Sequence, residues 1–193
     1  MAYAQQVQSH YTPQAYLQME RCATTKSEYV NGEIFAMSGA SRWHNRLTVS
    51  IVSELDLQMK GRTCNVYVND LRVKVNETGM YTYPDVVVVC GEEQFEDEEL
   101  DTLLNPTVII EVLSPSTEAY DRGGKFAHYR QVASLLEYLL VSQETLHVEH
   151  YIRQPDGQWL LSYASGGEAV IDLPTIGCRL SLAEVYKKTG LLG

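Results

Sequence analysis

Two carboxylates stand in the most apolar stretches of the sequence. Asp85 precedes four valines in "YPDVVVVC" (83–90), and Glu111 lies within "TVIIEVLSPST" (107–117). Burial of an unpaired carboxylate is unfavourable unless something compensates its charge. Two carboxylates on adjacent strands can hold a hard divalent cation through oxygen ligands, and the cation would offset their charge. We therefore expect a metal site at Asp85 and Glu111.

A lysine follows these two carboxylates in the sequence. The segment "SPSTEAYDRGGKFAHYRQV" predicts a loop and then a short helix from about residue 123, with Lys125 about one turn into it. An ammonium group beside a metal site can orient a water molecule or stabilise negative charge on a phosphoryl group. Asp85, Glu111 and Lys125 are therefore the candidate catalytic residues.

Each of the three has a structural alternative. Asp85 can cap a turn after Pro84, and Lys125 can lie on a solvated helix face and bond Asp121 four residues earlier. Glu111 can instead form a structural salt bridge. Its partner in that case would be Arg72, Lys74 or Lys125.

Three further residues are possible members of the site. Glu33 follows a hairpin turn and is either a strand-edge residue or a group near the metal. His44 is more typical of a core or capping histidine than of a ligand. Asp70 points into the site only if the chain bulges near it.

The first third of the chain predicts two helices around a hairpin. "YTPQAYLQME" is typical of a short helix with Thr12 as N-cap and Pro13 at its first position. "SEYVNGEIFAMSG" predicts a hairpin, because Asn-Gly is the preferred pair of a tight primed turn. "SRWHNRLTVSIVSELDLQMKG" predicts an amphipathic helix between Ser41 and Gly61, with His44 on its core side near its start.

The segment "CNVYVNDLRVKV" (64–75) predicts a strand in which the apolar residues change from even to odd positions. Its first apolar residues occupy even positions, and its last ones, Leu71, Val73 and Val75, occupy odd positions. Because side chains alternate between the faces of a strand, we expect a bulge near Asn69 and Asp70.

The remaining segments complete an α/β pattern. Strands are expected at 83–90, 107–113 and 136–142, then a second hairpin formed by "LHVEHYIR" and "QWLLSYA", and a closing helix at "SLAEVYKK". The continuous apolar runs suit central strands covered on both faces. We expect one domain, residues 1–193, with a mixed central β-sheet flanked by helices, an N-terminal hairpin and a C-terminal β-hairpin extension.

Composition narrows the class of protein. The net charge of -10 argues against nucleic-acid binding by charge alone, although bound Mg²⁺ can bridge a carboxylate site and a phosphate. The acidic stretch 91–100 is expected to be a solvated loop. Four cysteines without a C-x-x-C pair predict reduced thiols in a cytoplasmic protein. We expect no signal peptide and no membrane span.

Six segments together resemble one family. They are "YTPQAYLQME", "VNGEIFAMSGAS" with "HN" two residues later, "YPDVVVV", "IIEVLSPST", "YDRGGKF" with a tyrosine two residues later, and "EYLLV". The combination is similar to the large bacterial Uma-two family of restriction-endonuclease-like proteins, within the PD-(D/E)XK nuclease superfamily. The resemblance implies a restriction-endonuclease-like core in which Pro84-Asp85 is the first motif and Glu111 the acidic residue of the second.

The resemblance also implies a chemistry. Asp85 and Glu111 would bind Mg²⁺ or Mn²⁺, with the Val112 backbone carbonyl as a further ligand, and metal-activated water would cleave phosphodiesters, leaving 5′-phosphate and 3′-hydroxyl ends. One position departs from the superfamily pattern, because Leu113 stands where a lysine would follow the glutamate. The resemblance implies that this lysine has moved to the next helix, as Lys125.

The expected function is therefore a metal-dependent endonuclease acting on DNA. Two alternatives stay open: a catalytically silent binding or scaffold domain with the nuclease fold, and a metal-dependent hydrolase of a small phosphorylated molecule. We expect a homodimer, because two sites cut both DNA strands more easily than one, and the second hairpin could supply the dimer surface. A basic groove beside Asp85 would favour the nuclease. It would be formed by Arg42, Arg46, Arg72, Lys74 and Arg122.

Overall fold

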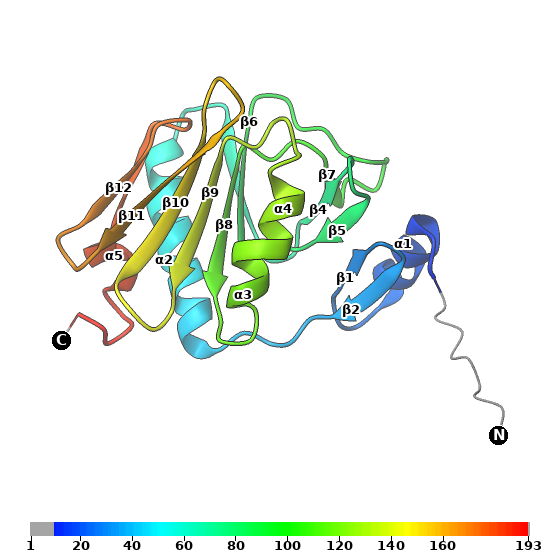
Figure 1. Cartoon of the computed structure of the whole chain (residues 1–193), viewed down its shortest axis with the longest axis horizontal. Helices are drawn as coiled ribbons and strands as arrows, with labels where there is room; N and C mark the ends of the chain where they lie inside the picture. The colour runs from blue at the N-terminus through cyan, green and yellow to red at the C-terminus, as the bar shows by residue number, and fades with distance from the viewer. Residues whose placement is uncertain (1–9, 193) are drawn as a thin grey trace.

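A six-stranded mixed sheet forms the centre of the structure, a computed structural model that describes residues 10–192 (Figure 1). Strands β8 and β9 are parallel, and the other neighbouring pairs are antiparallel. The α/β prediction with a mixed sheet is confirmed. In spatial order the strands are β11 (Trp159–Ser165), β10 (His147–Arg153), β9 (Glu137–Ser142), β8 (Val108–Leu113), β6 (Val86–Cys90) and β3 (Cys64–Val68).

The central strands β6 and β8 are buried on both faces, as their continuous apolar runs predict. Successive side chains point to opposite faces of a strand. Val86, Val88 and Ile110 therefore enter one core, and Val87 and Ile109 enter the other.

The first core lies beneath helix α2 (Arg42–Met59), which packs on one face of the sheet (Figure 1). Ser41 caps this helix by accepting a hydrogen bond from the His44 backbone N–H at 3.1 Å. Leu47, Ile51 and Leu55 recur along its buried stripe. The two-stranded sheet β12 (Val170–Leu173) and β13 (Cys178–Ser181) and helix α5 (Leu182–Tyr186) complete this layer.

A short helical segment and a second sheet cover the other face. The segment runs through α3 (Glu118–Tyr120), a π-helical turn η1 (Asp121–Lys125) and α4 (Phe126–Tyr129). It begins five residues earlier than the sequence pattern predicts. The second sheet is five-stranded, in the order β2 (Glu33–Ala36), β1 (Ser27–Val30), β5 (Met80–Thr82), β4 (Arg72–Val75) and β7 (Thr102–Leu103).

The N-terminal hairpin is joined to this second sheet and carries helix α1 (Pro13–Cys22). Its turn residues Asn31 and Gly32 have φ angles of 52° and 90°, the left-handed values that a primed turn requires. Tyr16 of α1 packs against Tyr29 and Tyr81, which pair across β1 and β5. The predicted helix, its Thr12 cap and the hairpin are confirmed.

The change of phase at residues 64–75 has a different cause from the bulge that we predicted. The segment is two strands in two sheets: β3 belongs to the six-stranded sheet and β4 to the five-stranded sheet. Asn69, with φ of 43°, and Asp70 form the turn between them. The phase changes because the chain enters another sheet, so the bulge prediction was wrong.

The prediction of four reduced cysteines was also wrong. Cys64 and Cys90 occupy paired positions on β3 and β6 and form a disulfide. Cys22 is exposed and Cys178 is buried, and both are free thiols. Within residues 10–192, none of the helices is long and apolar enough to span a membrane.

The acidic stretch 91–100 is more structured than a solvated loop. Glu96 lies between Lys74 and Tyr81, at 2.5 and 2.8 Å from their polar atoms. Glu93 accepts hydrogen bonds from Asn65 and from Tyr67. These carboxylates therefore fasten the stretch to β3, β4 and β5.

Candidate active site

Asp85 and Glu111 lie opposite each other at the point where β6 begins. The last pair of the β6–β8 ladder is Val86 with Ile110, so the next antiparallel position joins Asp85 and Glu111. The Asp85 backbone N–H donates to Glu111 Oε2 at 3.3 Å, and the Val112 N–H donates to Asp85 Oδ2 at 2.7 Å. The sheet therefore holds the two carboxylates side by side.

Lys125 reaches the same place from the helical segment. Its Nζ lies 3.1 Å from Glu111 Oε1, and the side chain is buried. It also lies 3.7 Å from Asp121 Oδ1, the contact expected for a solvated helix face, but burial excludes that alternative. Tyr129, four residues further along, donates its hydroxyl to Glu111 Oε1 at 2.9 Å. The structure thus brings all three candidate catalytic residues together.

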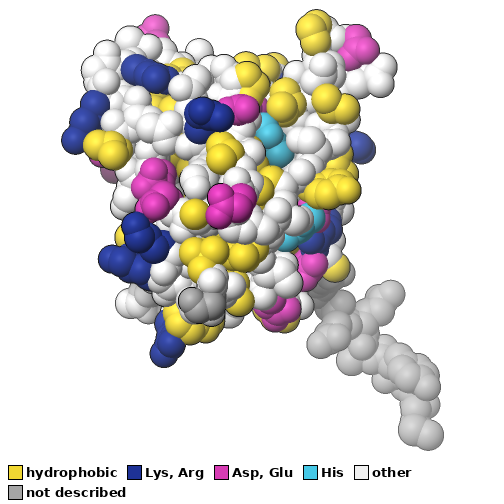
Figure 2. Space-filling model, turned by 90° about the vertical axis from the view of Figure 1, so that its left-hand side faces the viewer, with side chains coloured by type: hydrophobic (Ala, Val, Ile, Leu, Met, Phe, Trp, Pro, Cys, Tyr) yellow, Lys and Arg dark blue, Asp and Glu magenta, His cyan; other side chains and the backbone are white. Residues whose placement is uncertain are grey.

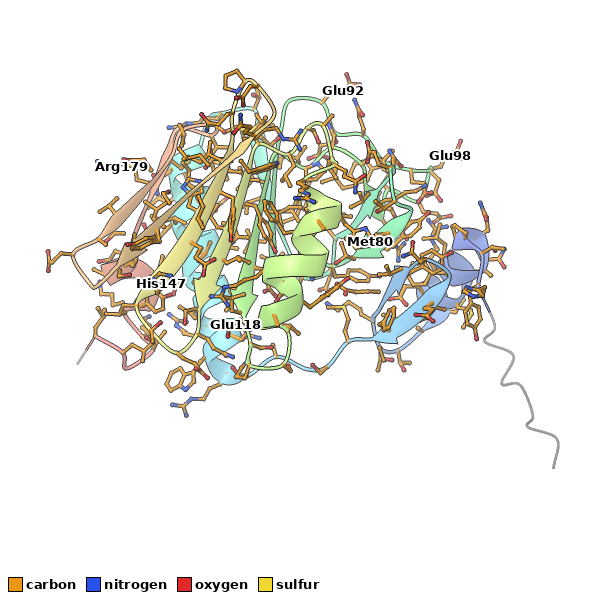
Figure 3. The ribbon with its side chains drawn as sticks, viewed as in Figure 1. Met80, Glu92, Glu98, Glu118, His147 and Arg179 are labelled. Atoms are coloured by element: carbon orange, nitrogen blue, oxygen red, sulfur yellow. A yellow bond between two sulfur atoms is a disulfide. The ribbon has the colours of Figure 1, made fainter. Side chains whose placement is uncertain are left out.

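The π-helical turn places Lys125 on the buried side of the segment. Such turns insert one extra residue and are frequent at functional sites. Gly124 lies within the turn, and a Cβ atom there would stand 2.8 Å from the Tyr120 ring. The close approach of Tyr120 therefore requires glycine at this position. Figure 3 shows the segment rising from Glu118, with side chains filling the space between it and β5, where Met80 is labelled.

A third carboxylate at the lysine is Glu28, which sequence reasoning did not find. Glu28 Oε1 lies 3.0 Å from Lys125 Nζ and accepts a hydrogen bond from the Thr82 hydroxyl. Glu33, the possible site residue of this hairpin, lies at the start of β2, opposite Val30, and its place in the site stays a prediction. The alternation of "SEYV" was the available signal, because Tyr29 faces α1 and its neighbour Glu28 must face the other way.

The other two possible site residues have opposite outcomes. His44 Nε2 lies 2.7 Å from Asp85 Oδ1, so the histidine at the start of α2 does reach the site. Asp70 does not: its side chain is 87% exposed and pairs with Lys26 Nζ at 2.8 Å. Asp70 was expected in the site only through the bulge that the structure replaces with a turn.

The site holds more negative than positive charge. Burial raises the pKa of Glu111 to about 8, against the lowering effect of Lys125. Burial also raises the pKa of Asp121. Burial alone would lower the pKa of Lys125, but Glu111, Glu28 and Asp121 together raise it well above its ordinary value. The lysine is therefore charged at neutral pH, and burial, together with the neighbouring carboxylates, favours the protonated form of Glu111.

The donor set fits a magnesium ion that keeps most of its water. No group of three or more His, Cys, Asp and Glu side chains within residues 10–192 is arranged to hold a metal. Mg²⁺, however, is commonly held by one or two carboxylates, with water and substrate oxygens as its other ligands. Asp85 and Glu111 are such a pair, and the excess negative charge around them favours a cation. The contact expected through the Val112 carbonyl stays a prediction.

The expected basic groove is only partly present. Of its five residues, three are in ion pairs: Arg72 with Asp101, Lys74 with Glu96, and Arg122 with both Glu118 and Glu149. Arg42 stacks on Trp43 at 3.9 Å, and Arg46 Nε is buried without a hydrogen-bond partner. Arg42 and Arg46 form no ion pair within the described chain, so they are the two groove residues whose charge is free.

Comparisons with known proteins agree with this fold. A profile of the Uma2 family, whose description is "Putative restriction endonuclease", matches residues 13–183. The chain is 42% identical to the uncharacterized protein sll1609 of Synechocystis sp., over 83% of this chain and 91% of that protein. It is 36% identical to the uncharacterized protein slr1290 of the same organism, over 91% of each. A crystal structure from Anabaena variabilis, described as a putative nuclease belonging to DUF820, superposes with a TM-score of 0.77 at 19% identity, over 92% of this chain and 98% of that chain.

Proposed function

The chain belongs to the Uma2 family of restriction-endonuclease-like proteins, and on that basis we propose that it is a metal-dependent endonuclease that hydrolyses phosphodiester bonds in DNA. The observation that carries the proposal is the pair of carboxylates Asp85 and Glu111 beside Lys125, of which Glu111 and Lys125 are buried. A structural salt bridge would need one carboxylate, whereas Lys125 faces three. This excess of carboxylates is typical of a site that takes up a cation.

Each residue has a role in the proposed reaction. Asp85 and Glu111 would hold Mg²⁺ or Mn²⁺, and the metal would supply an activated water and polarise the phosphate. His44 and the Val112 N–H fix the two oxygens of Asp85, so its orientation is set before substrate arrives. Lys125 would position the nucleophile or stabilise charge on the phosphoryl group.

The experiment combines metal binding with cleavage. Wild type, Asp85→Asn, Glu111→Gln and Lys125→Met are titrated with Mg²⁺ or Mn²⁺ by calorimetry and incubated with plasmid and single-stranded DNA. We expect both carboxylate variants to lose metal binding and all three variants to lose cleavage. Asp70→Asn is the matched control, because this aspartate lies outside the site. A wild type that neither binds metal at millimolar concentration nor cuts either substrate would refute the proposal.

One observation favours the silent binding domain as a second candidate. The net charge is -10, and three of the five expected groove cations are neutralised by carboxylates. A free nuclease would have to overcome repulsion from the DNA backbone. Wild-type protein that binds the metal and DNA without cutting would support this candidate, as would cleavage that appears only with a basic partner protein.

We also propose a homodimer that forms through strand β11, the outer edge of the six-stranded sheet. Leu160, Leu161 and Tyr163 on this strand are 56%, 49% and 74% exposed, and β11 carries no charge or proline. Charged residues and prolines usually protect the edge strands of native proteins against pairing. An edge without them is suited to pairing with a second copy. Figure 2 shows hydrophobic side chains on the side that β11 and β12 form, interspersed with charged ones.

Sedimentation measurements test the dimer. Tyr163→Lys should yield a monomer, because a lysine at the edge disfavours strand pairing. Leu57→Lys is the control, since Leu57 is 60% exposed on helix α2. A monomeric wild type, or a dimer that survives Tyr163→Lys, would exclude this interface.

A cytoplasmic location stays a proposal. It follows from the expected DNA substrate. The Cys64–Cys90 disulfide argues against it, because disulfides are rare in the cytosol. Thiol labelling of protein taken directly from cells would show whether this bond exists there.

A further inference from the structure

A cleft lies between α4 and the β10–β11 hairpin, outside the carboxylate site. Its volume is about 640 Å³, within the range of small-molecule sites. The lining combines flat rings, side-chain amides and a guanidinium group. It includes Phe126, Arg130, Gln131, Tyr151, Gln158 and Trp159.

Three aromatic rings form one side of the cleft. Phe126 lies 4.6 Å from Tyr151 and 5.3 Å from Trp159, measured between ring centroids. All three rings are partly buried, so each packs on the core and keeps some surface accessible. Partly exposed rings of this kind are the platforms on which nucleic-acid bases stack, whatever the base.

Two arginines at the cleft lack a carboxylate partner. Within residues 10–192, neither Arg130 nor Arg153 forms an ion pair, although the chain carries a net charge of -10. Arg153 stacks 4.9 Å above the Trp159 ring and donates to the backbone carbonyls of Ala133 and Arg130. Its Nε is buried without a hydrogen-bond partner, and burial lowers its pKa. The cleft therefore holds two arginines without an ion pair in the described chain, beside two carboxylates that accept from its lining, Glu149 from the Tyr151 hydroxyl and Asp156 from Gln158.

The cleft is connected to the proposed catalytic lysine. Phe126 follows Lys125 directly, and its ring stacks on that of Tyr138 at 5.1 Å and 5°. The Tyr138 hydroxyl donates to the Asp121 backbone carbonyl at 3.1 Å, at the start of the π-helical turn. A ligand in the cleft would thus lie against the element that positions Lys125.

We propose that this cleft binds one unstacked nucleotide, with its base on the aromatic rings and its phosphate at Arg130. Stacking rings supply affinity without sequence preference, and a guanidinium suits phosphate oxygens. The side-chain nitrogens of Gln131 and Gln158 donate to the Ala127 carbonyl and to Asp156, so these amides would meet a base edge through their oxygens. The assignment of this nucleotide to a DNA strand rests on the proposed endonuclease function. The proposal that the cleft binds a base with its phosphate does not depend on that function.

Tryptophan fluorescence tests the proposal without requiring cleavage. The described chain has two tryptophans, so Trp43→Phe leaves Trp159 as the reporter. This protein is titrated in EDTA with a short oligothymidylate and, separately, with thymidine monophosphate. We expect the oligothymidylate to quench Trp159, and Arg130→Ala to weaken binding about tenfold.

A matched arginine provides the control. Arg62→Ala removes the same charge from another arginine without an ion pair in the described chain, which bonds to the backbone carbonyls of Ile176 and Gly177 and lies outside both the groove and the cleft, and it should leave the affinity unchanged. Absence of quenching by both ligands, or equal weakening by Arg62→Ala and Arg130→Ala, would overturn the proposal. Equal affinity for the monophosphate and the oligothymidylate would support the site but assign it to free nucleotides. Quenching by a protein that never cuts DNA would retain the cleft and reject the endonuclease.

Discussion

Replacing Glu111 with glutamine should remove the part of the pH dependence of stability that this residue contributes in the metal-free protein. Glu111 is 3% exposed, and its oxygens accept from Tyr129, Lys125 and the Asp85 backbone. Glutamine keeps the shape and one acceptor oxygen but cannot ionise. The substitution therefore separates the cost of the buried charge from the packing of the side chain.

The sign and size follow from the pKa of Glu111. It is raised from 4.5 to about 8 on folding, so between these values the folded state binds a proton that the unfolded state has lost. Stability from this group is fully present below the unfolded pKa and is lost as pH rises through the folded pKa. Linkage over this interval gives a loss on the order of 3 kcal/mol between about pH 5 and about pH 8. Asp121 changes stability in the same direction, because its pKa is raised as well.

The assay is urea unfolding in EDTA across this pH interval. Comparing wild type with Glu111→Gln removes the titration of Glu111 and its coupling to Lys125 and Tyr129, while groups outside the site titrate alike in both proteins. The wild type should lose more stability with rising pH, and the variant should become the more stable protein at alkaline pH. Glu118→Gln, at an exposed carboxylate paired with Arg122, should retain the wild-type slope. Parallel curves for wild type and Glu111→Gln would mean that Lys125 keeps Glu111 ionised throughout, and our description of the site charge would be wrong.

Three further predictions concern the elements around the site. Lys125→Met should lower the free energy of unfolding by roughly 3–5 kcal/mol near neutral pH, because it leaves buried carboxylates without a cation. Urea titration measures this loss, and an effect below about 1 kcal/mol would contradict the burial of the lysine. Gly124→Ala should cost about 1–3 kcal/mol, since the added Cβ would stand 2.8 Å from the Tyr120 ring; calorimetric melting measures it, and restoration by Tyr120→Ala in the double variant would confirm the contact. Joint replacement of Cys64 and Cys90 by serine should cost about 2–4 kcal/mol by freeing the loop between them in the unfolded state, and reductant should then no longer shift the melting temperature, whereas it should shift that of the wild type.

The sequence predicted the candidate site best where charged residues stand in apolar runs that are expected to be buried. A carboxylate in a run of valines is costly, and Glu111 does lie buried in β8, next to Asp85, which is half-buried just before β6. Lys125 was a candidate from its type and its place in the helix after Glu111, and the resemblance added that it replaces the superfamily lysine. Spacing along the chain does not by itself show that a helix packs over a strand end. Their participation in catalysis stays a prediction.

The features that the sequence did not predict all depend on contacts between distant segments. Glu28 faces Lys125 because β1 joins β5, a pairing that no local pattern indicates. Cys64 and Cys90 meet only once β3 is paired with β6 in one register. The alternation of apolar residues showed that the buried face changes near Asp70, and a bulge would explain such a change. It could not show that the chain turns there and enters another sheet.

The site draws its residues from parts of the molecule that need not move together. Glu28 belongs to the five-stranded sheet, Glu111 to the six-stranded sheet and Lys125 to the helical segment, while Asp85 lies in the short passage from β5 to β6. A slight rotation of one sheet against the other would separate these groups before either sheet lost its own hydrogen bonds. The geometry of the cluster therefore depends on the relative orientation of the five-stranded and the six-stranded sheet. Mild denaturant should abolish the function of the cluster while the secondary structure is still intact.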